Sequence, residues 1–314
     1  MADVEGFTEA KQISGSSSST AKQFHIKGCA HLDWGMKNRL SRIIKPDTGR
    51  TVMLAVDHGY FQGPTSGLEN MEATLEPLIP YADCLMLTRG ILRSSVPAGS
   101  QVPIVLRVSG GNSILSELSN ETWNVSVEDC IRLNVSGMAM SIYVGAPHEH
   151  QTLAAFSDLI DAGYEAGIPV LAVTAVGRDM VRDARYLALA SRMAAEMGAN
   201  FVKTYYCEDF PRVTGTCPVP IVMAGGKKIP ELEALTMAYK AVTEGAVGVD
   251  MGRNIFQSDS PVGMIKAVRA VVHYNEKPES ALKIYKDEKK SSAPERINKK
   301  TGTATDKKRG GSKK

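Results

Sequence analysis

The sequence predicts an α/β protein folded as a closed (β/α)8 barrel. Eight short apolar runs recur along the chain, and stretches with apolar residues at helical spacing lie between or after them. The runs are continuously apolar instead of alternating, which is typical of parallel strands that are buried on both faces. Eight strand and helix units in about 250 residues match the usual size of such a barrel.

The eight expected strands follow one another from the first third of the chain to near its end. They cover residues 51–56, 84–87, 104–106, 139–144, 170–173, 200–203, 221–224 and 248–251. The clearest helices cover residues 152–163, 182–198, 231–245 and 261–273. Several of these helices end in glycine, which is a common stop signal.

An open doubly wound sheet is the alternative fold. That fold places a glycine fingerprint, GxGxxG, after its first strand. Here the first strand is followed by Asp57, His58, Gly59 and Tyr60, which do not match the fingerprint. The barrel is therefore favoured, and barrel enzymes carry their chemistry at the carboxyl ends of the strands.

The composition favours one large domain between two polar ends. We expect residues 1–23 to form a disordered lead, residues 24–285 the barrel, and residues 286–314 a basic disordered tail. Residues 289–314 hold ten lysines and arginines and two acidic residues, a local charge of +8, so the overall charge of +3 leaves −5 on residues 1–288. An acidic body makes nucleic-acid binding an unlikely function, apart from a weak polyanion-binding role for the tail.

Sequence features also predict where the protein works. We find neither an apolar stretch long enough for a membrane span nor the apolar segment of a secretory leader, so we expect a cytoplasmic protein. The five cysteines, an odd number without any CxxC pair, are interpreted as free thiols.

A lysine follows the apolar residues of the sixth expected strand. A closed barrel has no edge strand, so Lys203 must point into the barrel mouth or between the strands and the helices. Burial disfavours the charged form of an amine, and a neutral amine attacks a carbonyl to form a Schiff base. Asp57 and His58, at the end of the first strand, are the candidate proton-transfer groups, although a turn cap and a hydrogen-bonded histidine would explain them equally well.

Glycines and an arginine follow the seventh and eighth strands. Gly225, Gly226 and Gly252 would let backbone N–H groups approach an anion, and Arg253 could add a bidentate contact. Barrels commonly hold a phosphate between these two loops. The stretch does not match a P-loop. The three glycines and Arg253, taken together with Lys203, predict a phosphorylated carbonyl substrate.

Two further patterns carry less weight. His148 and His150 have the spacing of metal ligands, but no other ligand is clustered nearby, so no metal site is predicted. Tyr143 would share a strand face with Ser141 and Gly145 and is a secondary candidate for the barrel mouth.

Several stretches resemble the archaeal-type class I fructose-bisphosphate aldolase family. They are KGCAHLDWGMKNRLSRI, VMLAVDHGYFQGPTSGLE, LRVSGGNSILSELSNE, DMVRDARY, FVKTYY, CPVPIVMAGGKK and GVDMGRNIFQSD. Within that family the stretches closely resemble a thiolase subgroup that acts on 3-hydroxy-5-phosphonooxypentane-2,4-dione, the phosphorylated autoinducer-2 signal. The resemblance runs from about residue 24 to residue 285. It implies a class I aldolase-like barrel, a Schiff-base lysine at Lys203, and a phosphate site at Gly225, Gly226, Gly252 and Arg253.

The resemblance also implies a reaction. A thiolase of this subgroup cleaves the dione with coenzyme A, as cosubstrate and without a bound cofactor, to dihydroxyacetone phosphate and acetyl-CoA, and serves autoinducer-2 degradation. Its relatives assemble as homo-oligomers, pentamers or decamers. In true aldolases the fifth strand ends in a proton-donating tyrosine, whereas this chain has Ala175 there. Two alternatives stay open: an aldolase acting on a sugar phosphate such as fructose 1,6-bisphosphate, and an inert barrel whose tail recruits polyanions.

Overall fold

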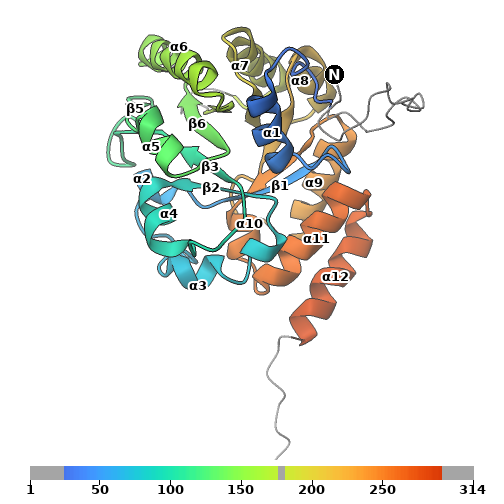
Figure 1. Ribbon diagram of the computed structural model, residues 1–314. Helices are drawn as coiled ribbons and strands as arrows, with labels where there is room; N and C mark the ends of the chain where they lie inside the picture. Colours follow the sequence, from blue (N-terminus) through green and yellow to red (C-terminus); the bar gives the residue numbers. More distant parts are fainter. Residues whose placement is uncertain (1–24, 176–180, 292–314) are drawn as a thin grey trace, which may run out of the picture.

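The computed structural model describes residues 25–175 and 181–291. The expected lead at residues 1–23 lies outside the described residues, and so does most of the expected tail. Figure 1 shows the central strands surrounded by helices.

Eight parallel strands close into a barrel, so the predicted fold is confirmed. Their order around the barrel is β1-β10-β9-β8-β7-β6-β3-β2. The strands are β1 Thr51–Ala55, β2 Cys84–Thr88, β3 Ile104–Arg107, β6 Gly137–Ile142, β7 Val170–Thr174, β8 Phe201–Tyr205, β9 Ile221–Ala224 and β10 Gly248–Met251. Two more strands, β4 Ser109–Gly110 and β5 Thr122–Trp123, form a small antiparallel sheet.

Helices follow or separate the strands. They are α1 Trp34–Ile43, α2 Gly59–Gln62, α3 Met71–Leu75, α4 Arg89–Ser95, α5 Val127–Arg132, α6 Glu149–Ala166, α7 Ala184–Glu196, α8 Phe210–Thr216, α9 Glu231–Thr243, α10 Arg253–Phe256, α11 Pro261–Tyr274 and α12 Pro278–Ser291, with a 3-10 turn at Ile79–Tyr81. Capping side chains explain several starts: Asp33, Ser126 and Asp183 each accept a hydrogen bond from a first-turn N–H. Helix α6 ends at Gly167, whose φ of 64° suits glycine.

The core has two layers because strand side chains alternate in direction. Outward-facing residues such as Leu54, Met140 and Val202 pack against the helices. Inward-facing residues at the amino ends of the strands, including Met53 and Phe201, pack against α1. Helix α1 therefore closes the amino end of the barrel, and the carboxyl end is left for the site.

The carboxyl boundary of the domain differs from the expected one. Helix α12 continues to Ser291, whereas we expected the disordered tail to begin at residue 286. Lys289 forms an ion pair of 2.6 Å with Asp259, and Glu288 pairs with Lys266 at 2.8 Å. Helix α12 also buries Ala281 and Tyr285, so its charged end continues a segment that packs against the barrel.

Candidate active site

A cavity of about 160 Å³ lies among the carboxyl ends of the barrel strands. It is lined by residues from β1, β3, β6, β7, β8, β9 and β10 and from the loops that follow several of them. Every residue that the sequence predicted for catalysis or phosphate binding lines it: Asp57, His58, Lys203, Gly225, Gly226, Gly252 and Arg253. Residues up to 196 positions apart in the chain therefore meet in one place.

Lys203 points into the barrel, so the first of its two predicted orientations is correct. It lies on β8 two residues after Phe201, on the same inward face, and is 9% exposed. Its Nζ lies 2.7 Å from Oδ2 of Asp250 and 3.6 Å from Sδ of Met86. A buried carboxylate, that of Asp250, therefore accompanies the amine.

Asp250 is one of the residues at the cavity that the sequence analysis missed, as is Arg107. It lies within β10 and is 1% exposed. Burial raises its pKa, and the charge and hydrogen bond of Lys203 offset only part of that effect. Apart from this ion pair, neither carboxylate oxygen has a hydrogen-bond partner among the described residues. An aspartate inside an apolar strand, GVDM, was the available signal.

Asp57 has a different partner. Nη2 and Nε of Arg107, at the end of β3, lie 2.8 and 2.9 Å from its Oδ2. Burial by itself would raise the pKa of Asp57, but the charges of Arg107 and Lys203 and the hydrogen bond from Arg107 hold it below the usual value. Asp57 is therefore a carboxylate at neutral pH.

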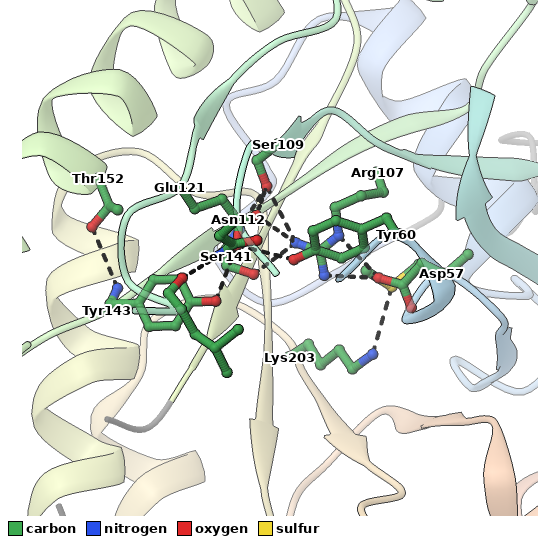
Figure 2. Close-up of polar contacts among 12 residues, drawn as sticks. Asp57, Tyr60, Arg107, Ser109, Asn112, Glu121, Ser141, Tyr143, Thr152 and Lys203 are labelled. Carbon is green, nitrogen blue, oxygen red and sulfur yellow. Dashed lines mark hydrogen bonds and ion pairs between the residues drawn. The ribbon is translucent and has the colours of Figure 1, made fainter. Parts of the chain in front are cut away.

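Arg107, besides binding Asp57, also contacts a buried group of hydroxyls and a second carboxylate. Figure 2 shows the Arg107 side chain beside Asp57, with Lys203 extending toward the two of them. Nη1 of Arg107 donates to Ser141 at 2.7 Å and lies 3.7 Å from Oε1 of Glu121. Glu121 is 0% exposed and also accepts a hydrogen bond from Ser109.

Glu121 fixes two tyrosines at the cavity. The hydroxyls of Tyr60 and Tyr143 donate to its Oε2 at 2.9 and 3.0 Å. Burial raises the pKa of both phenols, and the charge of Glu121 adds to this while Arg107 opposes it. Both therefore stay protonated at neutral pH. Tyr143, predicted as a secondary candidate, lines the cavity as expected.

His58 immediately precedes helix α2, at the edge of the cavity. Its ring stacks on Phe256 with centroids 5.7 Å apart, and its Nε2 lies 3.1 Å from Oγ1 of Thr65. Burial lowers the pKa of His58, although the neighbouring Asp57 opposes this. A neutral imidazole can accept one proton and donate another.

The glycines allow strands to approach closely at the other side of the cavity. A Cβ on Gly252 would lie 2.1 Å from the carbonyl oxygen of Ala55, and one on Gly225 would lie 3.0 Å from Cα of Met251. Gly226 has a φ of 68°. Lys227 and Lys228 do not line the cavity; Lys228 pairs with Glu231 at 2.6 Å. The cationic side chains at the cavity are thus Lys203, Arg107 and Arg253 among the described residues.

The remaining predictions concern cysteines, metal ligands and membranes. All five cysteines are unpaired and buried, as expected. His148 immediately precedes helix α6, and His150 lies in its first turn. No group of three or more histidine, cysteine or acidic side chains within residues 25–175 and 181–291 could hold a metal ion. In the same part of the chain, no helix is both long and apolar enough to cross a membrane.

Comparison with known proteins adds relatives of stated activity. The 3-hydroxy-5-phosphonooxypentane-2,4-dione thiolase of Escherichia coli K12 is 56% identical over 290 residues, which is 92% of this chain and all of that protein. The thiolase of the same name from Salmonella typhimurium matches equally well. An uncharacterized aldolase of Pasteurella multocida is also 56% identical over the same shares.

Solved structures agree with the sequence relatives. An archaeal fructose 1,6-bisphosphate aldolase has a TM-score of 0.69 and 25% identity, and the match covers 76% of this chain and 99% of that one. A second archaeal structure, with the same score and coverage, has its catalytic lysine covalently bound to the carbinolamine intermediate of the substrate.

Residues 51–258 match the model of the DeoC/LacD family aldolases, a range that holds all eight barrel strands and every residue of the predicted site. With this match and the 56% identity to the thiolases, the chain belongs to the DeoC/LacD aldolase family, in the group that contains the 3-hydroxy-5-phosphonooxypentane-2,4-dione thiolases.

Proposed function

We propose that the protein is a Schiff-base-forming thiolase that cleaves 3-hydroxy-5-phosphonooxypentane-2,4-dione with coenzyme A to dihydroxyacetone phosphate and acetyl-CoA. The observation that carries the proposal is the position of Lys203, a buried amine that shares one cavity with Arg253 and three glycines. The thiolases at 56% identity carry the name of this substrate. The archaeal neighbour with a lysine-bound carbinolamine supports the covalent step.

The phosphate end of the substrate would enter the glycine side of the cavity. Arg253 and the backbone around Gly225, Gly226 and Gly252 would hold the phosphate, whose charge does not change during the reaction. Their contribution is binding and orientation. The ketone next to the phosphonooxymethyl group is then held for attack by Lys203.

The covalent steps follow from a Schiff base at that ketone. The amine of Lys203 adds to the carbonyl carbon, water leaves, and the iminium withdraws electrons from the neighbouring carbon. The thiolate of coenzyme A attacks the acetyl carbonyl, and the carbon–carbon bond breaks with its electron pair entering the enamine. Protonation of the enamine carbon and hydrolysis release dihydroxyacetone phosphate and the free amine.

Proton transfers need groups in two protonation states. Asp57, held ionised by Arg107, can accept a proton, and the neutral ring of His58 can accept or donate one. Both line the cavity with Lys203. We propose Asp57 and His58 for the transfers at the thiol and at the enamine carbon.

An aldolase acting on fructose 1,6-bisphosphate is the alternative. Ala175 lines the cavity at the position where the resemblance implies a proton-donating tyrosine in true aldolases. A methyl group cannot donate a proton, so this site favours the thiolase. Tyr60 and Tyr143 also line the cavity, but they come from other elements than the fifth barrel strand, and the hydroxyl of each donates a hydrogen bond to Glu121.

Product analysis separates the two reactions. The protein is incubated with the phosphorylated dione and, separately, with fructose 1,6-bisphosphate, each with and without coenzyme A, and the products are identified by mass spectrometry. We expect acetyl-CoA and dihydroxyacetone phosphate only from the dione with coenzyme A. Cleavage of fructose 1,6-bisphosphate without any thiol would replace the thiolase by the aldolase, and no turnover of either would favour the inert barrel.

The setting of the enzyme also belongs to the proposal. We propose a cytoplasmic homo-oligomer, a pentamer or decamer, that serves degradation of phosphorylated autoinducer-2. Sedimentation of the full chain tests the assembly. Removal of residues 292–314, which leaves α12 whole, tests whether the basic end has a role apart from turnover.

A further inference from the structure

We propose that Asp250 is a catalytic residue that takes a proton from the ammonium of Lys203 and returns it to the hydroxyl of the carbinolamine. The inference rests on the proposed Schiff-base function and adds a residue to it. The sequence analysis did not assign a role to this aspartate, although it interrupts an apolar strand.

The first argument is contact. Oδ2 of Asp250 lies 2.7 Å from Nζ of Lys203, which is hydrogen-bond distance between the reacting nitrogen and a carboxylate. Lys203 and Asp250 both line the cavity, so a ketone bound to the nitrogen stays within reach of the carboxylate. Asp250 also sits on a rigid element, because its Cα is paired with Met53 of β1 and Ala224 of β9.

The second argument is that the carboxylate of Asp250 has no other hydrogen-bond donor among the described residues. Neither oxygen of Asp250 accepts a hydrogen bond from any other described residue. Asp57, in contrast, is engaged by two nitrogens of Arg107. A proton is accepted most readily by the carboxylate with fewer donors around it.

The surroundings of Lys203 separate the pKa values of its two neighbouring carboxylates, Asp250 and Asp57. Burial raises the pKa of Asp250 despite Lys203, whereas Arg107 and Lys203 hold the pKa of Asp57 down despite burial. Two further ionisable groups lie near the Lys203–Asp250 pair. Cys84 stays a neutral thiol because burial raises its pKa, and burial lowers the pKa of His58. Two carboxylates with separated pKa values can act at different steps. Asp250 exchanges the proton while the carbinolamine forms and loses water, and Asp57 stays charged during that step and is left for the later transfers.

The step balances in protons and charge. Transfer from Lys203 to Asp250 leaves a neutral amine and a neutral acid. The amine adds to the ketone, one of its two protons moves to the new alkoxide, and the other stays on the nitrogen of the carbinolamine. The acid of Asp250 then protonates the hydroxyl, water leaves, and the iminium forms beside the regenerated carboxylate. The site carries one positive and one negative charge before and after, so no charge is left unpaired in the cavity.

A purely structural role explains the pair less well. A buried ion pair contributes little net stability, because removing two charges from water costs about as much as their attraction returns. A small apolar residue would fit the strand pattern of Val249 and Met251 equally well. The carboxylate is thus better explained by proton transfer.

Two reactions of Lys203 test the assignment in the full-length protein. Borohydride trapping of dihydroxyacetone phosphate requires a base and then an acid, whereas carbamoylation by cyanate requires only the free amine; both are measured on the Lys203 peptide by mass spectrometry. In Asp250→Asn we expect trapping to fall about 100-fold, the usual size of a general acid–base contribution. Carbamoylation should stay the same or become faster, because the nitrogen of Lys203 is no longer held by the carboxylate of Asp250.

The outcomes separate the proposals. If Asp250→Asn traps the ketone within threefold of the wild-type rate, the role of Asp250 is overturned. The role is also overturned if trapping and carbamoylation fall equally, because the aspartate would then only position the amine. If trapping falls while carbamoylation is kept in Asp57→Asn, but not in Asp250→Asn, the proton transfer is assigned to Asp57 instead. If wild-type protein traps no ketone on Lys203, the proposed function itself fails.

Three further measurements complete the test, and the first two guard against misfolding. Asp83→Asn removes a buried carboxylate that pairs with Arg269 at 2.8 Å before the start of β2, outside the cavity, and should leave trapping unchanged. Formate added to Asp250→Ala should restore trapping at least tenfold, and no restoration contradicts the proposal. In wild-type protein the trapping rate should be level between pH 6 and 9, whereas a tenfold rise per pH unit would mean that solvent removes the proton.

Discussion

Nη2 of Arg107 lies 2.8 Å from Oδ2 of Asp57, and the side chains of these two residues are 5% and 7% exposed. They come from β3 and from the residues after β1, which are separated in the barrel by β2. The pair therefore ties one wall of the cavity together. It also leaves a carboxylate that stays charged beside the proposed nucleophile, Lys203.

Breaking this pair should destabilise the fold. In Arg107→Met the charge of Asp57 stays buried without its partner, and the free energy of unfolding should fall by about 3–5 kcal/mol. The double variant Arg107→Met/Asp57→Leu should regain more than about 1 kcal/mol of that loss. Urea unfolding of both measures the effect, and a double variant no more stable than the single one would contradict it.

The Arg107–Asp57 pair should also make the free energy of unfolding depend on pH in the acidic range. The pKa of Asp57 is lower in the folded protein than in the unfolded chain, so its stabilising contribution is complete above the unfolded value of about 3.9. That contribution is lost as the pH falls through the folded value. Urea midpoints measured from pH 6 to pH 3 should therefore decline less steeply in Asp57→Asn than in the wild type. Parallel declines would show that other carboxylates are responsible.

Lys203 should be the trapped lysine. Lys203→Ala should abolish borohydride trapping of dihydroxyacetone phosphate, because the variant lacks the amine at the cavity. Lys227→Ala is the matched control, since Lys227 is exposed and outside the cavity, and it should trap normally. Intact-mass and peptide mass spectrometry give the extent and position of the adduct. An adduct that persists on Lys227 or Lys228 would identify a different nucleophile.

Arg253 should serve binding more than chemistry. A hydrogen bond to a charged group contributes about 1.5–3 kcal/mol, so Arg253→Gln should raise KM for the phosphorylated dione about tenfold or more. Its kcat should change much less, because the phosphate charge is the same in the ground and transition states. Steady-state kinetics at saturating coenzyme A measure both constants. A loss in kcat with unchanged KM would place Arg253 in the chemical step.

Gly252 should tolerate no side chain. Its Cβ would meet the carbonyl oxygen of Ala55 at 2.1 Å, so Gly252→Ala must push β10 and β1 apart. Overpacking of this kind costs about 1–3 kcal/mol or more. Gly59→Ala is the control, because nothing lies within 4 Å of the position of its Cβ. Thermal unfolding compares the two, and equal stability would contradict the close approach.

Much of the site could be read from local pattern. Lys203 in an apolar strand, Asp57 and His58 after the first strand, and the glycines after the seventh and eighth were found because barrel strands end on one face. The position of each along the chain was enough to place it at the cavity. Ala175 was noted through the resemblance to the aldolase family, and it also lines the cavity.

The partners of these residues could not be read in the same way. Arg107 looked like the end of an apolar run, Glu121 like part of a polar loop, and Asp250 like an interruption of the last strand. Each becomes meaningful only through a contact across the barrel: Arg107 with Asp57, Glu121 with Tyr143, and Asp250 with Lys203.

The sequence by itself determined the barrel, its strand order in the chain and the residues that reach its carboxyl end, because hydrophobic periodicity and chain punctuation are local properties. The tertiary structure decided which charges meet, where α12 ends and which carboxylate accompanies the lysine. Closure of the barrel brings β8 and β10 to the same cavity across β9, and contacts between residues 47 positions apart leave no trace in the spacing of either segment.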